Sequence, residues 1–372
     1  MKFSIQRDEI YEVLQKVVSV IPQRSTISTT QNVLLTARGN QLELMTTDLE
    51  ITMVSHVNAQ IEEEGAIAVP GKLVHDIIRE LPNVSLTLSA GGNYRAELRS
   101  DFGHYKIGGE NPAEFPKRPL LETVREIQLP NDTLKRLLDK SSFASSTDEL
   151  RPALTGLFFE IGAGKMRTVA TDGHRLAMMT YRSDDLPEDD IRAILSTRAI
   201  NFVMRNLEPE GITALAFGDK HARVHMDNTI LFARLIDEQY VDYNRVIPPE
   251  TQFEMAIDTA SFLSSVKRVS LFSNPITAQV VFRIGAEQVE VQAEDLDYGG
   301  EASESIPCTY TGEEMTIGFN SRYLQDLLRH IDAPQVVFRL IRPDFAVLAE
   351  PGDGPENEEQ LMLLMPIRLE SA

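Results

Sequence analysis

The sequence repeats itself three times at a spacing close to 124 residues. Three segments have the pattern of a strand followed by a helix, KFSIQRDEIYEVL, REIQLPNDTLKRLL and FEMAIDTASFLSSV. Their apolar anchors Ile5, Leu129 and Ile257 lie 124 and 128 residues apart. Repeats of 20 to 50 residues would predict a solenoid or a propeller, whereas a unit of this length is a domain with its own core. The register predicts three equivalent domains, over 1–120, 126–247 and 252–372.

Two further markers keep the same register. The segments TTDLE, ATDGH and AEDLD place Asp48, Asp172 and Asp295 at separations of 124 and 123 residues. Helix-like stretches begin near positions 7, 72, 132, 198, 259 and 320, so each unit contains two of them. Six similar helices at even intervals predict a pseudo-symmetric molecule, which suits a partner that is itself symmetric or encircled.

The local patterns predict an α+β fold with antiparallel sheets and with helices gathered on one side. LLTARGNQLELMTT has apolar residues alternating on both sides of a turn, which is typical of a β-hairpin, and the second and third units repeat it. In the second helix Leu73, Ile77, Ile78 and Leu81 recur at helical spacing and predict one buried face. Proline-rich stretches near 115–125 and 245–252 are the expected links between domains.

Composition limits the class of protein. The chain is 42% hydrophobic and 25% charged, which is ordinary for a soluble globular protein. A single cysteine, Cys308, excludes an internal disulfide framework and fits a reducing cytosol. No apolar run is long enough to span a bilayer, and MKFSIQRDEI lacks the apolar core of a signal peptide. We therefore expect a cytoplasmic protein without a membrane partner.

Charge is distributed unevenly along the chain. The net charge is −20, yet the six predicted helices together carry +5, which leaves −25 for the other segments. If the helices share one surface, that surface is basic on an acidic body and attracts a polyanion to one face. The alternative is that acidic loops only promote solubility. Charge alone leaves both interpretations open.

No motif assembles a catalytic site. Asp172 and His174 would point to the same face of a strand, but no serine or cysteine nucleophile motif lies near them. Asp48 and Asp295 recur without a histidine, which favours a turn-supporting aspartate. The segment 162–165, GAGK, lacks the full phosphate-loop pattern, and the seven histidines show no metal-ligand spacing. The sequence predicts a binding protein without a metal or cofactor, and not an enzyme.

The chain resembles the bacterial DNA polymerase III beta subunit family, the DNA sliding clamps, from MKF to the terminal MPIRL. The most specific motifs are ATDGHRLA at 170–177, YVDYNRVIP at 240–248 and LLMPIRL at 363–369. The resemblance implies a head-to-tail homodimer closed into a ring, with helices lining the hole and sheets outside. Such a ring is a non-catalytic processivity factor that encircles double-stranded DNA, slides along it without reading its sequence, and tethers a polymerase.

The resemblance also implies DNA-binding residues. Arg24 follows the first helix, where the family has a DNA-contacting arginine, and Arg151 and Arg198 occupy similar basic positions. The helix pattern adds further basic candidates, for which a solvated helix face is an equally good interpretation: Arg79, Arg205 and Lys267.

A hydrophobic pocket between the second and third domains is implied in the same way. In the family it receives short linear peptides from the DNA polymerase III catalytic subunit, the clamp loader, other polymerases and repair proteins. The matching residues are Leu154, Thr171, Gly173, His174, Arg175, Leu176, Val241, Arg245, Val246, Leu363, Met365, Pro366, Ile367 and Arg368. Of these, His174, Arg175 and Arg368 are expected to frame the rim of the pocket. Ring closure is expected at Tyr105, Ile107, Leu271 and Phe272.

The sequence departs from the family pattern in a few places. Val241 stands where a proline is common, Ile367 stands where methionine is frequent, and residues 370–372 extend past the usual end. Pro152 and Ala153 replace an aromatic pair. Two other hypotheses stay open: a hydrolase that uses Asp172 and His174, and a multi-domain peptide-binding scaffold that does not encircle DNA.

Overall fold

The computed structural model describes residues 1–122, 124–295 and 299–369. The chain forms two compact units: unit 1 is Met1–Leu134 with Asn201–Leu235, and unit 2 is Lys135–Ile200 with Ile236–Ala372. The boundary between the units falls within helices α3 (Asn131–Ser142) and α4 (Thr197–Asn206). Both units combine antiparallel sheets with helices, so the predicted α+β class is confirmed.

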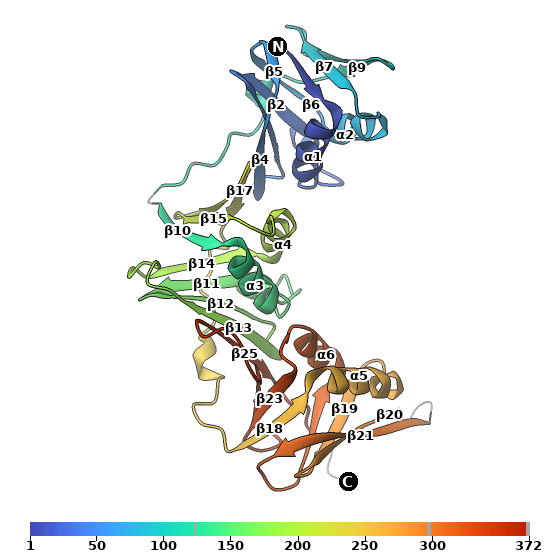
Figure 1. Cartoon of the computed structure of the whole chain (residues 1–372), viewed down its shortest axis with the longest axis vertical. Helices are drawn as coiled ribbons and strands as arrows, with labels where there is room; N and C mark the ends of the chain where they lie inside the picture. Colours follow the sequence, from blue (N-terminus) through green and yellow to red (C-terminus); the bar gives the residue numbers. More distant parts are fainter. Residues whose placement is uncertain (123, 296–298, 370–372) are drawn as a thin grey trace. The chain divides into compact units, whose positions relative to one another are not determined.

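Unit 1 contains two sheets (Figure 1). The smaller sheet has five strands in the order β5 (Gln60–Glu63), β1 (Lys2–Gln6), β7 (Ser85–Ala90), β8 (Arg95–Ser100) and β9 (Gly103–Gly108). The larger sheet has eight strands in the order β10 (Arg125–Pro130), β15 (Ile212–Phe217), β16 (His221–Met226), β17 (Thr229–Arg234), β4 (Ile51–Asn58), β3 (Gln41–Thr47), β2 (Asn32–Arg38) and β6 (Gly65–Pro70).

Helices α1 (Arg7–Val18) and α2 (Gly71–Glu80) each bury one apolar face in unit 1. Helix α2 ends at Glu80, just before the sequence Leu81-Pro82, because proline cannot continue a helix. The predicted face of α2 was partly wrong. Val74 and Ile78 are its buried apolar residues, whereas Leu73 is half exposed. Val74 and Ile78 lie one helical turn apart, and this offset turns Leu73 away from the core.

Unit 2 is organised around one twelve-stranded sheet. Its order is β14 (Ile191–Ser196), β11 (Gly156–Gly162), β12 (Lys165–Thr171), β13 (Arg175–Arg182), β25 (Glu358–Leu364), β24 (Val347–Pro351), β23 (Gln335–Leu340), β18 (Phe253–Asp258), β21 (Gly300–Tyr310), β20 (Gln288–Asp295), β19 (Gln279–Ile284) and β22 (Met315–Asn320). Short 3₁₀ segments lie at η3 (Pro152–Thr155), η4 (Tyr243–Arg245) and η5 (Ser270–Phe272).

Polar side chains fix where the helices of unit 2 begin. At the start of α5 (Thr259–Val269), the Asp258 side chain accepts a hydrogen bond from the Ser261 amide at 2.8 Å. At the start of α6 (Ser321–Arg329), Asn320 Oδ1 accepts from the Arg322 amide at 2.9 Å. These caps satisfy amides that have no partner inside the helix, so both helices begin where the repeat predicts.

The second repeat supplies strands to both units. In unit 1 its strand β17 pairs with β4 of the first repeat, with Thr229 opposite Ser55. In unit 2 its strand β13 pairs with β25 of the third repeat over seven residue pairs, and Figure 1 shows these two strands side by side. Each pairing removes two open sheet edges. The two compact units therefore share the second repeat between them, and their boundary does not coincide with the boundaries between the repeats.

Candidate peptide and nucleic-acid interfaces

An apolar cluster in unit 2 joins the second and third repeats. The stacked rings of Phe158 and Tyr240 lie at its centre, with centroids 4.7 Å apart, and the Tyr243 ring meets Phe158 edge-on at 6.3 Å. The buried members are Leu154, Phe158, Val169, Leu176, Ile194, Tyr240, Tyr243, Ala346, Leu348 and Leu363. The cluster contains Leu154, Leu176 and Leu363 of the predicted pocket, so the structure brings these three together.

The two tyrosines of this cluster keep their hydroxyl protons. Burial, together with a hydrogen bond from the hydroxyl to Glu160 Oε2 at 2.8 Å, raises the pKa of Tyr243 to about 12. Burial also raises the pKa of Tyr240, whose hydroxyl donates to the Val169 carbonyl at 3.3 Å. Both hydroxyls are thus hydrogen-bonded within the protein, and the two aromatic rings contribute to the buried apolar floor that the cluster forms.

Three exposed apolar side chains lie close in sequence to residues of this buried cluster. Val246 is 51% exposed and precedes Ile247, which packs against the cluster. Met365 is 40% exposed and follows β25, which carries the buried Leu363. Val241, next to Tyr240, is likewise open to solvent. Each of these three side chains lies within two residues in sequence of a residue in or packed against the cluster, and we refer to them as the apolar rim. Exposed apolar side chains beside a buried apolar cluster can take the apolar anchors of a peptide. The thioether of Met365 is flexible enough to adapt to different anchors.

The turn between β12 and β13 holds four of the predicted pocket residues. Thr171 Oγ1 donates to the Arg175 carbonyl at 2.6 Å and accepts from the Gly173 amide at 3.1 Å. Gly173 has a φ of +93°, and a Cβ at this position would lie 3.3 Å from Arg151 Nη1. The positive φ favours glycine at this position, whereas the end of the exposed Arg151 side chain can move aside for a Cβ. His174 is exposed, and its carbonyl accepts from the Met365 amide at 2.9 Å.

Arg175 differs from the expectation that it frames the pocket rim. Its side chain is only 12% exposed, and its guanidinium pairs with Asp172 at 3.1 Å and with Asp326 at 2.8 Å. Two other arginines of the predicted pocket are open to solvent. Arg245 is exposed and pairs with Asp242, three residues before it, at 2.8 Å, and Arg368 is exposed near the C-terminus.

The C-terminal segment leads away from the cluster. The amide of Ile367 donates to the Gly318 carbonyl at 2.8 Å, which forms an isolated bridge to β22. Pro366 and Ile367 are half-buried along this path. The predicted pocket residues 363–368 thus begin at the apolar floor and end beside β22. The extension at 370–372 lies outside the described residues.

Sequence reasoning missed part of this site. Phe345 is partly exposed and precedes Ala346, which belongs to the cluster with Leu348. These residues lie in RPDFAVLAE, where a turn passes into β24, and no periodic pattern marks them. Tyr240 and Tyr243 belong to the quoted motif YVDYNRVIP, and buried aromatic residues within a link between domains were the available signal.

The predicted DNA-binding residues are all exposed, but their surroundings differ. Within the described ranges, Arg24, Arg205 and Lys267 have no acidic partner. Arg79 pairs with Asp76 at 3.1 Å, and Arg151 with Asp148 at 2.9 Å. Neighbouring carboxylates reduce the positive field of those two arginines, so the first three are the stronger candidates for phosphate contacts. Arg198 lies in the first turn of α4.

The predicted dimer-interface residues fall into two groups, one on strand β9 and one in the 3₁₀ segment η5. Tyr105 and Ile107 belong to β9, the last strand of the five-stranded sheet. The Ile107 side chain is only 3% exposed, so it belongs to the core of unit 1. In unit 2, Leu271 is 81% exposed and Phe272 is partly exposed, and both follow α5. Ile276, a few residues later, is also exposed and was not predicted.

Strand β21 has an open margin near Phe272. Residues 300–307 pair with β20 on one side, whereas β18 pairs only with residues 308–310. Among the described residues, no strand occupies the other side of 300–307. Phe272 lies next to Gly300, because a Cβ on that glycine would meet the Phe272 ring at 3.4 Å.

The residues considered for catalysis have structural roles. Asp172 and His174 lie in a turn and not on a strand, so the expectation that they share a strand face was wrong. Asp172 Oδ1 accepts from the His174 amide at 2.9 Å, and Asp48 Oδ1 accepts from the Glu50 amide at 3.0 Å. Both aspartates support turns, as predicted. The segment 162–165 forms the β11–β12 hairpin turn, in which Gly164 has a φ of +68°.

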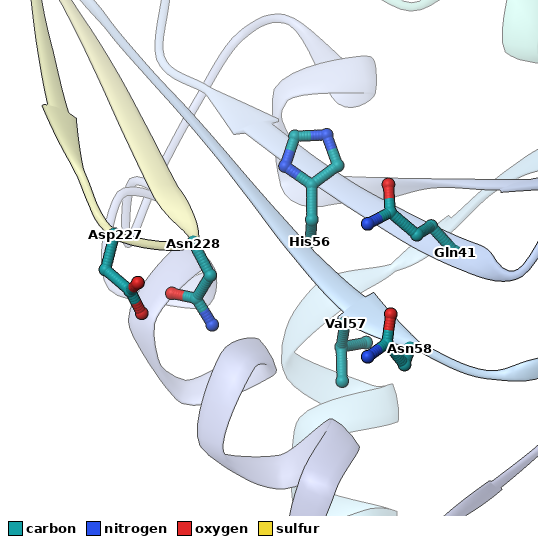
Figure 2. Close-up of a pocket in the computed structure, with 6 residues that line it drawn as sticks. All are labelled: Gln41, His56, Val57, Asn58, Asp227 and Asn228. Carbon is teal, nitrogen blue, oxygen red and sulfur yellow. The ribbon is translucent and has the colours of Figure 1, made fainter.

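A polar pocket of about 520 Å³ lies in unit 1. Figure 2 shows that its lining comes from β3, β4 and the turn between β16 and β17: Gln41, His56, Val57, Asn58, Asp227 and Asn228.

In the part of the chain that the structure describes, no group of three or more His, Cys, Asp or Glu side chains could hold a metal ion. No helix of these residues is long and apolar enough to cross a membrane.

Comparison with known proteins identifies the family. Three family models match consecutive parts of the chain: the N-terminal, central and C-terminal domains of the DNA polymerase III beta subunit, at residues 1–119, 128–242 and 244–368. The beta sliding clamps of Pseudomonas putida and Caulobacter vibrioides are each 31% identical, over 99% of this chain and 100% of theirs.

Solved structures agree with the sequence comparison. The crystal structure of the sliding clamp of Pseudomonas aeruginosa bound to griselimycin matches with a TM-score of 0.94 and 28% identity, over 99% of this chain and 100% of that one. The clamp of Bartonella birtlesii, also bound to griselimycin, matches with a TM-score of 0.93 and 29% identity over the same shares. The chain belongs to the DNA polymerase III beta subunit family, the beta sliding clamps.

Proposed function

We propose that this chain is the processivity factor of DNA polymerase III. Two copies close head to tail into a ring that encircles duplex DNA, slides along it and tethers the polymerase. Each copy supplies three domains, over 1–120, 126–247 and 252–372, and its six helices face the DNA. The ring has no catalytic activity of its own and works in the cytoplasm, where replication takes place.

The observation that carries the ring is a pair of complementary sheet margins, one in the first repeat and one in the third. Strand β9 ends its sheet and exposes His104 and Lys106. The open side of β21 belongs to a strand that exposes Glu301. A strand margin pairs readily with another strand, and opposite charges favour this partner over a second β9. Tyr105, Leu271 and Phe272 add apolar contact, and Ile107 contributes only its backbone.

The apolar site in unit 2 is the docking point for partner proteins. Its rim offers Val241, Val246 and Met365 to short linear peptides of the DNA polymerase III catalytic subunit, the clamp loader, other polymerases and repair proteins. The relatives from Pseudomonas aeruginosa and Bartonella birtlesii were crystallised with griselimycin. We propose that griselimycin also binds this chain, at the apolar site of unit 2.

Primer extension tests the proposal. With a clamp loader and the polymerase III catalytic subunit on a singly primed circular template, the wild-type chain should lengthen the products of one binding event. Val246→Glu places a carboxylate on the apolar rim and should abolish this gain. Leu150→Glu places the same group at an even more exposed apolar residue outside the cluster and should retain it. If the wild-type chain leaves the product length unchanged, the proposal is contradicted. The remaining hypothesis is then a peptide-binding scaffold that does not encircle DNA.

A further inference from the structure

Arg175 joins the turn at the peptide site to a helix of the third repeat. Its Nη1 donates to Asp326 Oδ2 of α6 at 2.8 Å, and its guanidinium lies over the Tyr323 ring, 4.7 Å from the centroid. On the other side it donates to the Phe143 carbonyl at 3.1 Å and lies 5.5 Å from the centre of that ring. A guanidinium between two aromatic faces and a carboxylate is held in one position.

The stack extends beyond the arginine in both directions. The His174 ring lies on Tyr323, with centroids 6.0 Å apart and planes 17° apart. Phe143 stacks on His330 at 3.9 Å, and the His330 Nδ1 contacts the Asp326 carbonyl at 2.7 Å. The exposed His174 at the pocket is thereby connected, through Tyr323 and Arg175, with α6 and with the residue that follows α3.

The first repeat shows that this arginine is not needed to form the turn. There, Thr47 Oγ1 donates to the Ile51 carbonyl at 3.0 Å, as Thr171 does to that of Arg175. Asp48 Oδ1 accepts from the Ile51 amide at 2.7 Å, as Asp172 does from that of Arg175 at 3.0 Å. The same turn thus forms with a buried isoleucine at the position of the arginine. The side chain of Arg175 must serve another purpose.

We propose that Arg175 is a positioning residue, which fixes the turn 171–175 at the peptide site to helix α6 and does not itself contact the peptide. The inference rests on the proposed function of the apolar site in unit 2. It replaces the expectation that Arg175 frames the rim, because the guanidinium is already enclosed by Asp172, Asp326 and Tyr323. Since α6 is one of the helices assigned to the DNA-facing surface, the contact links the two proposed binding surfaces.

The experiment removes the partner of Arg175 on α6. Asp326→Asn keeps the shape of the side chain but weakens its bond to the guanidinium, and Asp326 is not part of the apolar cluster. Two probes report binding by the full chain: griselimycin, and a fluorescein-labelled peptide that copies the clamp-binding segment of a DNA polymerase III catalytic subunit. We expect Asp326→Asn to weaken both by about fivefold, a usual size for coupling between sites.

A matched control lies on the same helix. Arg329 is the other partner of Asp326, at 3.0 Å, so Arg329→Gln disturbs the same carboxylate but leaves the contact with Arg175 in place. It should bind both probes as the wild type does. Arg175→Met should weaken binding at least as much as Asp326→Asn, and the double variant should be no weaker than Arg175→Met alone, because both changes break one contact. Arg175→Lys should not restore binding, since lysine lacks the planar fork.

The outcomes separate the inference from the function on which it rests. If Asp326→Asn binds like the wild type while Arg175→Met is weakened, or if the two losses add, Arg175 acts by direct contact and the inference is wrong. If the wild type binds neither probe, the apolar site is not the docking point and both proposals fail. If Arg175→Met does not fold, as judged by circular dichroism, the comparison of Asp326→Asn with Arg329→Gln still decides.

Discussion

At the scale of single residues, the Glu43 carboxylate of unit 1 has two side-chain partners that favour its charged form. His56 Nε2 hydrogen-bonds Glu43 Oε2 at 3.1 Å, and Arg118 Nη2 donates to the same oxygen at 2.6 Å. These two partners outweigh the effect of burial and lower the pKa of Glu43 to about 2. Because Arg118 lies in the proline-rich link after the first repeat, this contact ties the link to strand β3.

The depressed pKa of Glu43 predicts a pH-dependent contribution to stability. A carboxylate whose folded pKa lies below its unfolded value stabilises the fold above the unfolded pKa and loses this effect as pH falls through the folded one. Glu43→Gln should therefore lower the free energy of unfolding by about 1 to 3 kcal/mol at pH 7. This difference between variant and wild type should disappear as the pH falls from about 4.5 to about 2. Thermal unfolding by circular dichroism at several pH values measures it.

A surface pair provides the control for this prediction. Glu62 pairs with Lys2 at 2.6 Å, and both side chains are about 40% exposed. Glu62→Gln should change the free energy of unfolding by less than about 0.5 kcal/mol at both pH 7 and pH 2, because solvent screens exposed ion pairs. A cost of Glu43→Gln that is the same at pH 2 and pH 7 would show that the carboxylate charge is not responsible.

The residues of the peptide site were predictable only in part. Leu154, Leu176 and Leu363 belong to one cluster, as the family resemblance implied. Arg175 was placed on the rim because a motif gives the position of an arginine but not its partners. Asp326 lies 151 residues away in sequence, and nothing local to Arg175 indicates that the two side chains meet.

At the scale of elements, helices and hairpins have local signatures, and the sheets that join the repeats do not. The six helices begin within a residue or two of their predicted positions because caps, prolines and apolar spacing fix them locally. Ser55 and Thr229, which are 174 residues apart, meet across β4 and β17 through their hydroxyls at 2.8 Å. Such long-range pairing depends on which strand edges come together in the folded chain, so the repeat pattern alone could not predict the eight-stranded sheet.

The exposed apolar group after α5 gives a prediction about assembly. Leu271→Asp with Phe272→Asp should convert the proposed dimer to monomers, because each charge would be buried in the proposed interface without a counter-ion. Sedimentation velocity measures the change. Leu150→Asp is the control, since Leu150 is also an exposed apolar residue but lies outside both margins, and it should sediment like the wild type. A doubly substituted chain that remains a dimer would remove these residues from the interface.

At the scale of the whole molecule, the chain combines a net charge of −20 with exposed basic side chains on or near its helices. Arg24, Arg205 and Lys267 have no acidic partner within the described residues. Weak phosphate contacts of this kind attract duplex DNA without reading its sequence. A surface that held DNA tightly would slow sliding, so modest positive charge suits a tether.

Salt dependence tests this assignment. We consider the chain binding a short linear duplex without a clamp loader. Arg24→Gln should reduce the magnitude of the negative slope of log association constant against log salt concentration by about 0.9, the value for one lost phosphate contact. Fluorescence anisotropy over a salt series gives the slope. Lys165→Gln, at the exposed β11–β12 turn, should leave it unchanged. Equal losses for both variants would mean that Arg24 contacts DNA no more than an exposed lysine elsewhere on the protein does.

The most direct test of the ring is retention on DNA before and after the DNA is cut. The chain is loaded onto closed circular duplex with a clamp loader, unbound protein is removed, and the circle is then linearised with a restriction enzyme. A ring held by topology stays on the closed circle and leaves the linear form by sliding off its ends. Equal retention on both forms would mean that the protein grips DNA directly, and it would contradict the proposed mechanism.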